Sequence, residues 1–401
     1  MNKLLPVKGF KTAGIAAGIK KDATRKDLML IYSEAPAVAA GVFTLNLAAA
    51  APVRLSQERI GAPGHQAVIV NSGNANACTG AEGFGNAVEI TALAAAALGI
   101  APEAVLTAST GIIGVQLPMG PFRDKVAALA AALEDPASMN APEAIMTTDT
   151  FPKTASRQIL LDDRTVTLSG FAKGSGMIHP NMGTMLGFVM TDAAISKTLL
   201  QKALSAATTL SFNQVSVDGD TSTNDCCFVL ANGMAGNGEV AAEGPDYAAF
   251  ASALTELCTD LAMLIAKDGE GATKLLEARV EGAVSDEAAR ALAKAVIGSS
   301  LVKAAFFGND ANWGRIVCAL GYAGVPADLS QAAVALRSSG GFLKVYEDGA
   351  GIVFDEAVAL QVLQCGQVAI EIRLKDGPGT GVAWGCDLTY DYVKINGDYR
   401  S

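Results

Sequence analysis

A glycine-rich stretch that runs directly into an uninterrupted apolar segment constrains this chain more than any other feature. Residues 173–183 contain three glycines, and residues 185–191 read Met-Leu-Gly-Phe-Val-Met-Thr. Glycine permits turn conformations, and a short apolar run bounded by turn residues is typical of a buried strand. We therefore expect a loop over 173–183 and a strand that begins at Thr184.

The position of Thr184 at the start of this strand suggests a chemical role. Cleavage of the Gly183–Thr184 bond would free the amine of Thr184 beside its own hydroxyl, and such an amine can act as the base for a hydroxyl nucleophile. Glycine-threonine pairs are also common in turns, so these residues alone favour an ordinary strand start. Both interpretations stay open until other motifs are considered.

Strand-like and helix-like segments alternate along the rest of the chain. The expected strands are 66–70, 104–108, 226–231, 367–374, 380–387 and 389–395, with a hairpin over 159–168. The expected helices are 86–98, 123–134, 194–208, 245–266 and 285–298, the last with Ser285 as its N-cap. The length of 401 residues suggests about two domains. This alternation predicts an α/β fold with mixed sheets and helices in layers.

Charge and composition exclude several classes of function. The chain has 30 basic and 40 acidic residues, a net charge of −10, without a basic stripe, so we expect no nucleic-acid partner. The apolar stretch 90–101 is too short to span a bilayer, and the N-terminus lacks the apolar region of a signal peptide. We therefore expect no membrane partner and a cytoplasmic location. Seven scattered cysteines without a CxxC motif predict neither a metal site nor a disulfide framework.

The chain has only two histidines, which limits mechanisms that use an imidazole base. His65 lies in a glycine-proline turn before a strand, where we expect it to be exposed to solvent. His179 lies in the loop before Thr184, where we expect it to order the backbone. A mechanism without histidine therefore fits this sequence better.

One strand end could stabilise a developing negative charge. Thr110 and Gly111 follow the strand 104–108. Acyl chemistry needs hydrogen-bond donors aimed at the oxyanion, and a threonine hydroxyl with an adjacent glycine N–H could supply two. An ordinary turn at the end of a strand would have the same composition.

Two further segments offer groups for a small charged ligand. Glu270 lies between two glycines after the long helix 245–266, where it could pair with a substrate ammonium group or simply accompany helix termination. The chain ends on polar residues from Asn396 to Ser401. Such a tail is normally frayed, but if it is ordered, Asn396 and the terminal carboxylate could contact a ligand.

Eight motifs, taken in order, resemble the ornithine acetyltransferase family, also called the arginine biosynthesis bifunctional protein family. These proteins are the glutamate N-acetyltransferases of arginine biosynthesis. The motifs are Val-Asn-Ser-Gly-Asn-Ala-Asn-Ala-Cys-Thr-Gly (70–80), Thr110-Gly111, Thr-Thr-Asp-Thr (147–150), 176–186, Asp-Thr-Ser-Thr-Asn-Asp (220–225), Lys-Asp-Gly-Glu-Gly-Ala-Thr-Lys (267–274), Asn-Trp-Gly-Arg-Ile (312–316) and 396–401. They extend over nearly the whole chain.

The resemblance implies a self-cleaving enzyme with an N-terminal threonine nucleophile. It implies a cleavage site at Gly183–Thr184 that yields an α chain of residues 1–183 and a β chain of residues 184–401. It implies Thr184 as the acetyl acceptor, with Thr110 and Gly111 as the oxyanion hole. The substrate-binding residues that it implies are Thr147, Lys173, Thr184, Glu270, Asn396 and Ser401. Where the family usually has alanine before the nucleophile, this chain has Gly183.

The resemblance also implies a fold, an assembly and substrates. The fold is an N-terminal-nucleophile-like αββα arrangement related to aminopeptidases, assembled as an α2β2 heterotetramer. The acetyl group moves from N-acetylornithine to glutamate, and no cofactor is implied. Use of acetyl-CoA as a co-substrate stays open, because the family includes members of both kinds. Two other functions stay open: a self-cleaving aminopeptidase-type hydrolase and an uncleaved binding protein.

Overall fold

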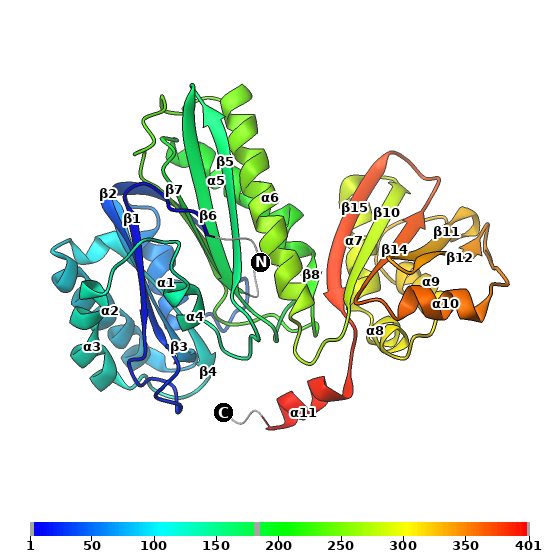
Figure 1. Ribbon diagram of the computed structural model, residues 1–401, viewed down its shortest axis with the longest axis horizontal. Coiled ribbons are helices and arrows are strands. Elements are labelled where there is room, and N and C mark those ends of the chain that lie inside the picture. Colours follow the sequence, from blue (N-terminus) through cyan, green and yellow to red (C-terminus); the bar gives the residue numbers. More distant parts are fainter. Residues whose placement is uncertain (1–3, 180–184, 399–401) are drawn as a thin grey trace.

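The computed structural model describes residues 4–179 and 185–398 of the chain and has two mixed sheets with helices packed on them (Figure 1). Gly183, Thr184 and Ser401 lie outside the described residues. The first sheet has the strand order β4-β3-β2-β9-β7-β6-β5, with β1 paired to β2, and the second has the order β13-β12-β11-β14-β10-β15-β8. The predicted α/β fold with mixed sheets is confirmed.

The first sheet is built from both sides of the 180–184 segment. Its strands are β1 (Phe10–Ile15), β2 (Leu28–Phe43), β3 (His65–Asn74), β4 (Val105–Ile112), β5 (Lys153–Leu161), β6 (Arg164–Lys173), β7 (Leu186–Thr191) and β9 (Cys226–Ala231). Its helices are α1 (Ala51–Arg59), α2 (Gly80–Leu98), α3 (Met119–Ala131), α4 (Asn140–Ala144), α5 (Lys197–Leu210) and α6 (Pro245–Lys267). Figure 1 shows this part in blue to yellow-green.

The second sheet is built mainly from the C-terminal part. Its strands are β8 (Val215–Ser216), β10 (Leu275–Ala283), β11 (Ala333–Ser338), β12 (Gly341–Glu347), β13 (Ala350–Gly351), β14 (Gln367–Arg373) and β15 (Gly379–Cys386). The helices of this part are α7 (Asp286–Gly298), α8 (Ser300–Phe307), α9 (Trp313–Gly321), α10 (Glu356–Leu363) and α11 (Tyr390–Asp398). The Ser285 side chain accepts a hydrogen bond from Ala288 N at 3.2 Å, which confirms it as the cap of α7.

The central strand β7 joins the two halves of the chain. All six residues of β7 are buried, and the strand pairs antiparallel with β6 and parallel with β9. A strand that is buried on both faces needs an almost continuous apolar sequence, which explains the run 185–191. Phe171 of β6, Phe188 of β7 and Phe228 of β9 pack in series, with ring centroids 5.7 and 5.9 Å apart. The predicted chains 1–183 and 184–401 therefore share one sheet and one core.

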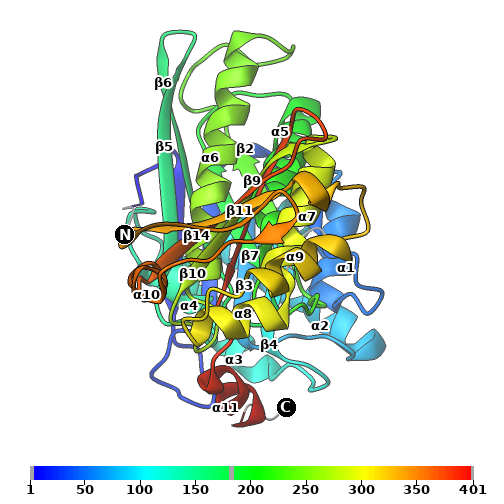
Figure 2. The same cartoon turned by 90° about the vertical axis from the view of Figure 1, so that its right-hand side faces the viewer.

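Helix α6 lies between the two sheets and contacts β5 and β6 on one side and β10 and β15 on the other (Figures 1 and 2). Among the described residues it is the one helix long and apolar enough to cross a membrane by length and composition. Nine of its side chains, including Phe250 and Leu257, are buried in the core. A core helix passes the same test, so this feature is weak support for a membrane span.

The structure corrects two expectations. Residues 389–395 were expected as a strand, but α11 covers most of them and none of its side chains is buried. The segment comes three residues after the end of β15, and no described strand pairs with it, so its alternating pattern forms no ladder. His65 was expected at the surface, but it is fully buried as the first residue of β3. Burial also lowers the pKa of its imidazole.

Candidate active site

A pocket of about 130 Å³ lies where strand ends of the first sheet meet the loops after α6 and β6. It is lined by Thr110, Gly111, Ile113, Thr147, Thr148, Lys173, Gly176, Met177, Met185, Leu186, Ser222, Asn224, Asp225, Glu270 and Asn396. Six of these were singled out from the sequence, namely Thr110, Gly111, Thr147, Lys173, Glu270 and Asn396. The structure therefore brings together every candidate that lies in its described part. Met185, the residue after Thr184, also lines the pocket.

The backbone at Gly111 cannot carry a side chain. Strand β4 pairs parallel with β3, and Gly111 lies beside Gly73 with a φ of +132°. A Cβ built on Gly111 would lie 2.4 Å from the carbonyl carbon of Gly73. Both the positive φ and this close approach require glycine, which explains the Thr110-Gly111 pair at the strand end.

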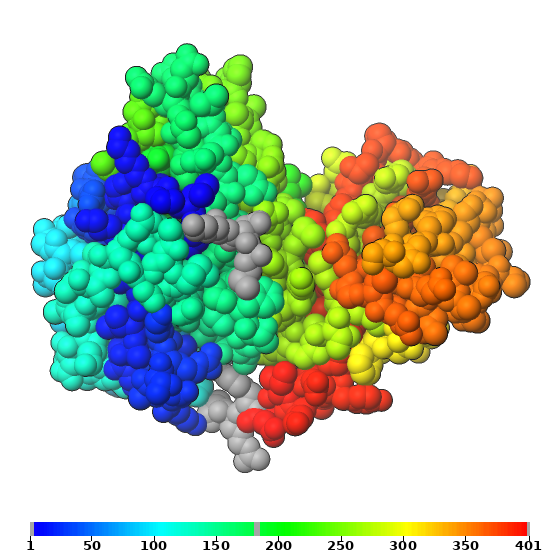
Figure 3. All heavy atoms as spheres, in the orientation of Figure 1, coloured from blue at the N-terminus to red at the C-terminus, as the bar shows by residue number. Residues whose placement is uncertain are grey.

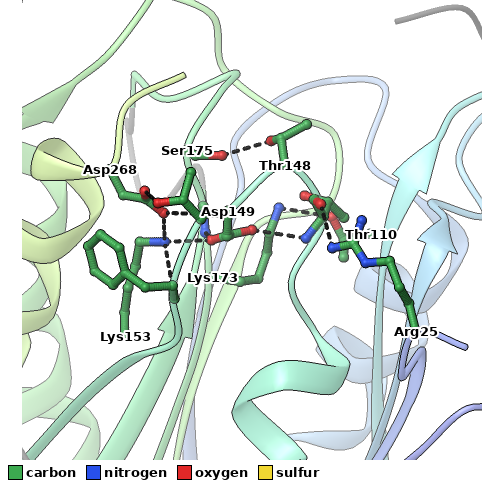
Figure 4. Close-up of polar contacts among 12 residues, drawn as sticks. Arg25, Thr110, Thr148, Asp149, Lys153, Lys173, Ser175 and Asp268 are labelled. Carbon is green, nitrogen blue, oxygen red and sulfur yellow. Dashed lines mark hydrogen bonds and ion pairs between the residues drawn. The ribbon is translucent and has the colours of Figure 1, made fainter. Parts of the chain in front are cut away.

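Lys173 connects the end of β6 to the predicted oxyanion hole. Its Nζ lies 3.3 Å from Oγ1 of Thr110 (Figure 4). A protonated lysine can only donate, so the Thr110 oxygen accepts this hydrogen bond. The hydroxyl hydrogen of Thr110 is then available for another acceptor. Burial lowers the pKa of Lys173, and the negative charge of Asp149 opposes that effect.

A buried cluster of three charges lies behind the pocket. Lys153 Nζ lies 2.6 Å from Oδ1 of Asp149 and 2.6 Å from Oδ2 of Asp268 (Figure 4). Asp149 also accepts hydrogen bonds from the backbone N–H of Thr147 at 2.9 Å and of Gly174 at 2.7 Å. Burial favours the neutral carboxyl, but Lys153 and Lys173 outweigh it and hold the pKa of Asp149 well below its usual range.

This cluster was not found from the sequence. Residues 147–153 suggested only a turn whose side chains bond to the local backbone, which Asp149 does in part. The available signal was an acid and a lysine four residues apart, directly before a strand. The partner Asp268 lies 115 residues further along the chain, so sequence patterns near Lys153 could not indicate it.

Glu270 also lines the pocket. Its backbone N–H donates to Ser175 O at 2.9 Å, and its carboxylate accepts from Nδ2 of Asn396 at 2.8 Å. Asn396 belongs to α11, which Figure 3 shows in red at the lower edge of the molecule, below the end of α6. The loop after β6 is also joined to the loop before β5, because Thr148 Oγ1 lies 2.7 Å from Ser175 Oγ. Glu270 is therefore held between the loop after β6 and the C-terminal helix.

The loop between β1 and β2 contacts the backbone beside the pocket residue Thr147. The sequence patterns did not predict this contact. Lys20 Nζ donates to Met146 O at 2.8 Å, and Arg25 Nη2 donates to Thr147 O at 3.1 Å. The Asp27 carboxylate accepts hydrogen bonds from the backbone N–H groups of residues 17–20, which fixes the loop. Burial and the nearby Arg25 lower the pKa of Lys20 to about 8.

His179 lies outside the set of pocket-lining residues. Its Nδ1 is 2.9 Å from Oγ of Ser216, and its carbonyl accepts from Thr221 Oγ1 at 3.0 Å. Burial and the charge of Lys294 lower its pKa to about 4, so the imidazole is neutral at physiological pH. These contacts hold the imidazole and the carbonyl of His179, and its ordering of the loop backbone stays a prediction.

Comparison with known proteins gives the family. Residues 11–401 match the model of the ArgJ family. The chain belongs to the ArgJ family. ArgJ-family proteins are acetyltransferases of arginine biosynthesis, so this chain is an enzyme of that class.

Relatives of similar length support membership of the ArgJ family. The arginine biosynthesis bifunctional protein ArgJ of Symbiobacterium thermophilum is 53% identical over 394 residues, which is 98% of this chain and 97% of that protein. ArgJ 1 of Clostridium acetobutylicum is 49% identical over 392 residues, which is 98% of this chain and 96% of that protein. The crystal structure of ArgJ from Bacillus halodurans matches with a TM-score of 0.51 and 49% identity, covering 54% of this chain and 100% of that chain.

Proposed function

We propose that this protein transfers an acetyl group from N2-acetyl-L-ornithine to L-glutamate through an acetyl-Thr184 intermediate, after it cleaves itself between Gly183 and Thr184. One observation carries the proposal: Thr110, Lys173 and Glu270 line one pocket together with Met185, the residue that follows Thr184. Oxyanion donors, a cation and a carboxylate are the groups that an acetylated amino acid needs.

In the proposed reaction the free amine of Thr184 takes the proton of its own hydroxyl as Oγ attacks the acetyl carbonyl. The Thr110 hydroxyl and the Gly111 N–H stabilise the oxyanion. The acetyl C–N bond then breaks, and ornithine leaves with the proton on its amine. Glutamate enters, and its neutral amine attacks the acetyl ester, which releases N-acetylglutamate and restores Thr184. Both amino acids use one site in turn.

The charges of the pocket suit N-acetylornithine, which has one carboxylate and one free ammonium group. Lys173 supplies a positive charge for the substrate carboxylate, and it has three N–H groups, so it can bind substrate and Thr110 together. Glu270 supplies a negative charge for an ammonium group, with Thr147 and Asn396 as further polar contacts. Ser401, outside the described residues, is proposed to bind the same substrate.

Two observations support self-cleavage into chains that stay together. The Bacillus halodurans crystal chain is matched over its whole length by 54% of this chain, and residues 184–401 make up the same share, 218 of 401. Pairing of β6 with β7 and of β2 with β9 would hold the two cleaved chains in one sheet. We propose an α2β2 heterotetramer of the cleaved chains, and a cytoplasmic location.

The test is incubation of the purified protein with N-acetylornithine alone, followed by mass spectrometry. We expect one added acetyl mass on the β chain at Thr184, and glutamate should remove it. Steady-state kinetics with both substrates should give parallel double-reciprocal plots. Intersecting plots without an acetylated β chain would mean direct transfer and contradict the mechanism. Release of acetate without acetylglutamate would indicate an aminopeptidase-type hydrolase, and a single uncleaved, inactive chain would indicate a binding protein. The same incubation with acetyl-CoA tests it as a donor.

A further inference from the structure

The carboxylate of Asp149 is buried behind the pocket and is not among the groups that line it. It nevertheless accepts a hydrogen bond from the N–H of Thr147, which lines the pocket. It accepts another from the N–H of Gly174, which directly follows the pocket residue Lys173. Its third hydrogen bond comes from Lys153. In the described part of the chain, Asp149 is thus connected to the site through the backbone of Thr147 and Gly174.

The charges that face Lys173 come from several elements. Asp149, Asp225 and Glu270 favour its charged form, whereas Lys153 and Lys20 oppose it. Of the three acids, Asp149 has the largest effect. Lys153 is shared between Asp149 and Asp268, so these three groups together carry one negative charge, which Lys173 balances.

We infer that Asp149 is a positioning residue for the oxyanion hole: its carboxylate keeps Lys173 protonated, and protonated Lys173 makes the Thr110 hydroxyl donate into the pocket. The inference rests on the proposed function, in which Thr110 stabilises the oxyanion. A lysine ammonium has no acceptor, so the Thr110 oxygen must accept from it. A neutral lysine amine can accept, and the Thr110 hydrogen can then turn towards Lys173 and away from the reacting oxygen.

This arrangement predicts the direction of a pH effect. Thr110 donates while Lys173 is charged, so activity is present below the pKa of Lys173 and is lost as the pH rises through it. Removal of the negative charge of Asp149 lowers that pKa. At lower pH, activity rises as the Thr184 amine loses its proton. Asp149→Asn is expected to leave the pH of this rise unchanged.

The experiment compares wild type with Asp149→Asn, measuring the single-turnover rate of β-chain acetylation by N-acetylornithine across pH on fully cleaved protein. We expect the alkaline loss of activity to move down by about 1–3 pH units, the usual effect of one nearby charge. Asp268→Asn is the matched control, because Asp268 bonds to the same Lys153 but is not among the main charges that shift Lys173. It should lower the unfolding temperature and move the alkaline limb less than Asp149→Asn does.

A double-mutant test separates positioning from general damage. In a Thr110→Ala background, Asp149→Asn should no longer change the alkaline limb, because the hydroxyl that it orients is absent. At saturating N-acetylornithine, Lys173→Met, which needs no buried charge, should lower the acetylation rate, and combining it with Thr110→Ala should be no worse than the more severe single variant. The pair Lys173→Met and Thr110→Ala keeps the inference testable if Asp149→Asn does not fold.

The outcomes distinguish this inference from the proposed function. Failure of the wild type to form acetyl-Thr184 would contradict the proposed function. If the wild type is acetylated, any of three results would overturn the role of Asp149 alone. These are an unmoved alkaline limb in Asp149→Asn, an equal shift in Asp268→Asn, and fully additive effects of Lys173→Met and Thr110→Ala.

Discussion

The carboxylate of Glu270 lies directly against the backbone of Gly176. A Cβ built on Gly176 would lie 2.2 Å from Glu270 Oε2 and 2.5 Å from Oε1. The loop after β6 therefore needs glycine at this position, so that the carboxylate which follows α6 can reach the pocket. The same carboxylate accepts from Asn396, so one close contact joins three distant segments of the chain.

Gly176→Ala should displace Glu270 from its position. Loss of one charge-assisted contact costs about 1.5–3 kcal/mol, so KM for N-acetylornithine should rise about tenfold to a hundredfold. Gly85→Ala in α2 is the control, since its Cβ would meet nothing within 4 Å, and it should leave KM unchanged. Unchanged steady-state kinetics in Gly176→Ala would show that the Glu270 carboxylate is not used.

Thr184→Ala should leave the chain uncut, because the attacking hydroxyl is absent. Gel electrophoresis should show only full-length protein of 40.9 kDa, whereas the wild type should give two bands near half that mass. Thr184→Ser keeps a hydroxyl and should still cleave. Two bands from Thr184→Ala would remove Thr184 from the cleavage mechanism.

Thr110→Ala should lower kcat by about 10²–10³ while KM stays nearly unchanged, because an oxyanion donor acts only in the transition state. Steady-state kinetics on cleaved protein would measure both constants. Thr110→Ser retains the hydroxyl and should recover much of the rate. An effect confined to KM would mean that Thr110 only binds substrate.

Lys153→Met should destabilise the fold strongly. It leaves Asp149 and Asp268 buried without their shared cation, and removal of one partner of a buried ion pair costs about 3–5 kcal/mol. Lys344→Met is the control: it breaks an exposed pair with Glu347, which is worth at most about 1 kcal/mol. Denaturant unfolding measures both, and equal losses would contradict a structural role for the buried cluster.

Activity should rise between about pH 7 and 8, because the free Thr184 amine must be neutral to act as the base and an α-amino group titrates near pH ~8. His179 cannot produce this rise, since its pKa is lowered to about 4 and it is already neutral there. His179→Asn should therefore keep the rise in a plot of kcat/KM against pH. Its disappearance would identify His179 as the base.

Local patterns in the sequence predicted much of the secondary structure around the site, although not the helix that carries Asn396. The apolar run after Thr184 became β7, the Asp162-Asp163 turn joined β5 to β6, and Ser285 capped α7. These features depend on side-chain periodicity and turn chemistry within a few residues, which a single sequence shows directly. The ordered motifs likewise indicated the family and named six of the residues that line the pocket.

Tertiary structure alone decided which of these residues meet and how they are charged. Residues 390–395 belong to helix α11, and His65 is buried because β3 lies inside the first sheet. Lys173 reaches Thr110 across 63 residues of sequence, and Lys153 reaches Asp268 across 115. Burial and ion pairing depend on such distant partners, so the sequence by itself could name Thr110 as a donor but not the buried charges around it.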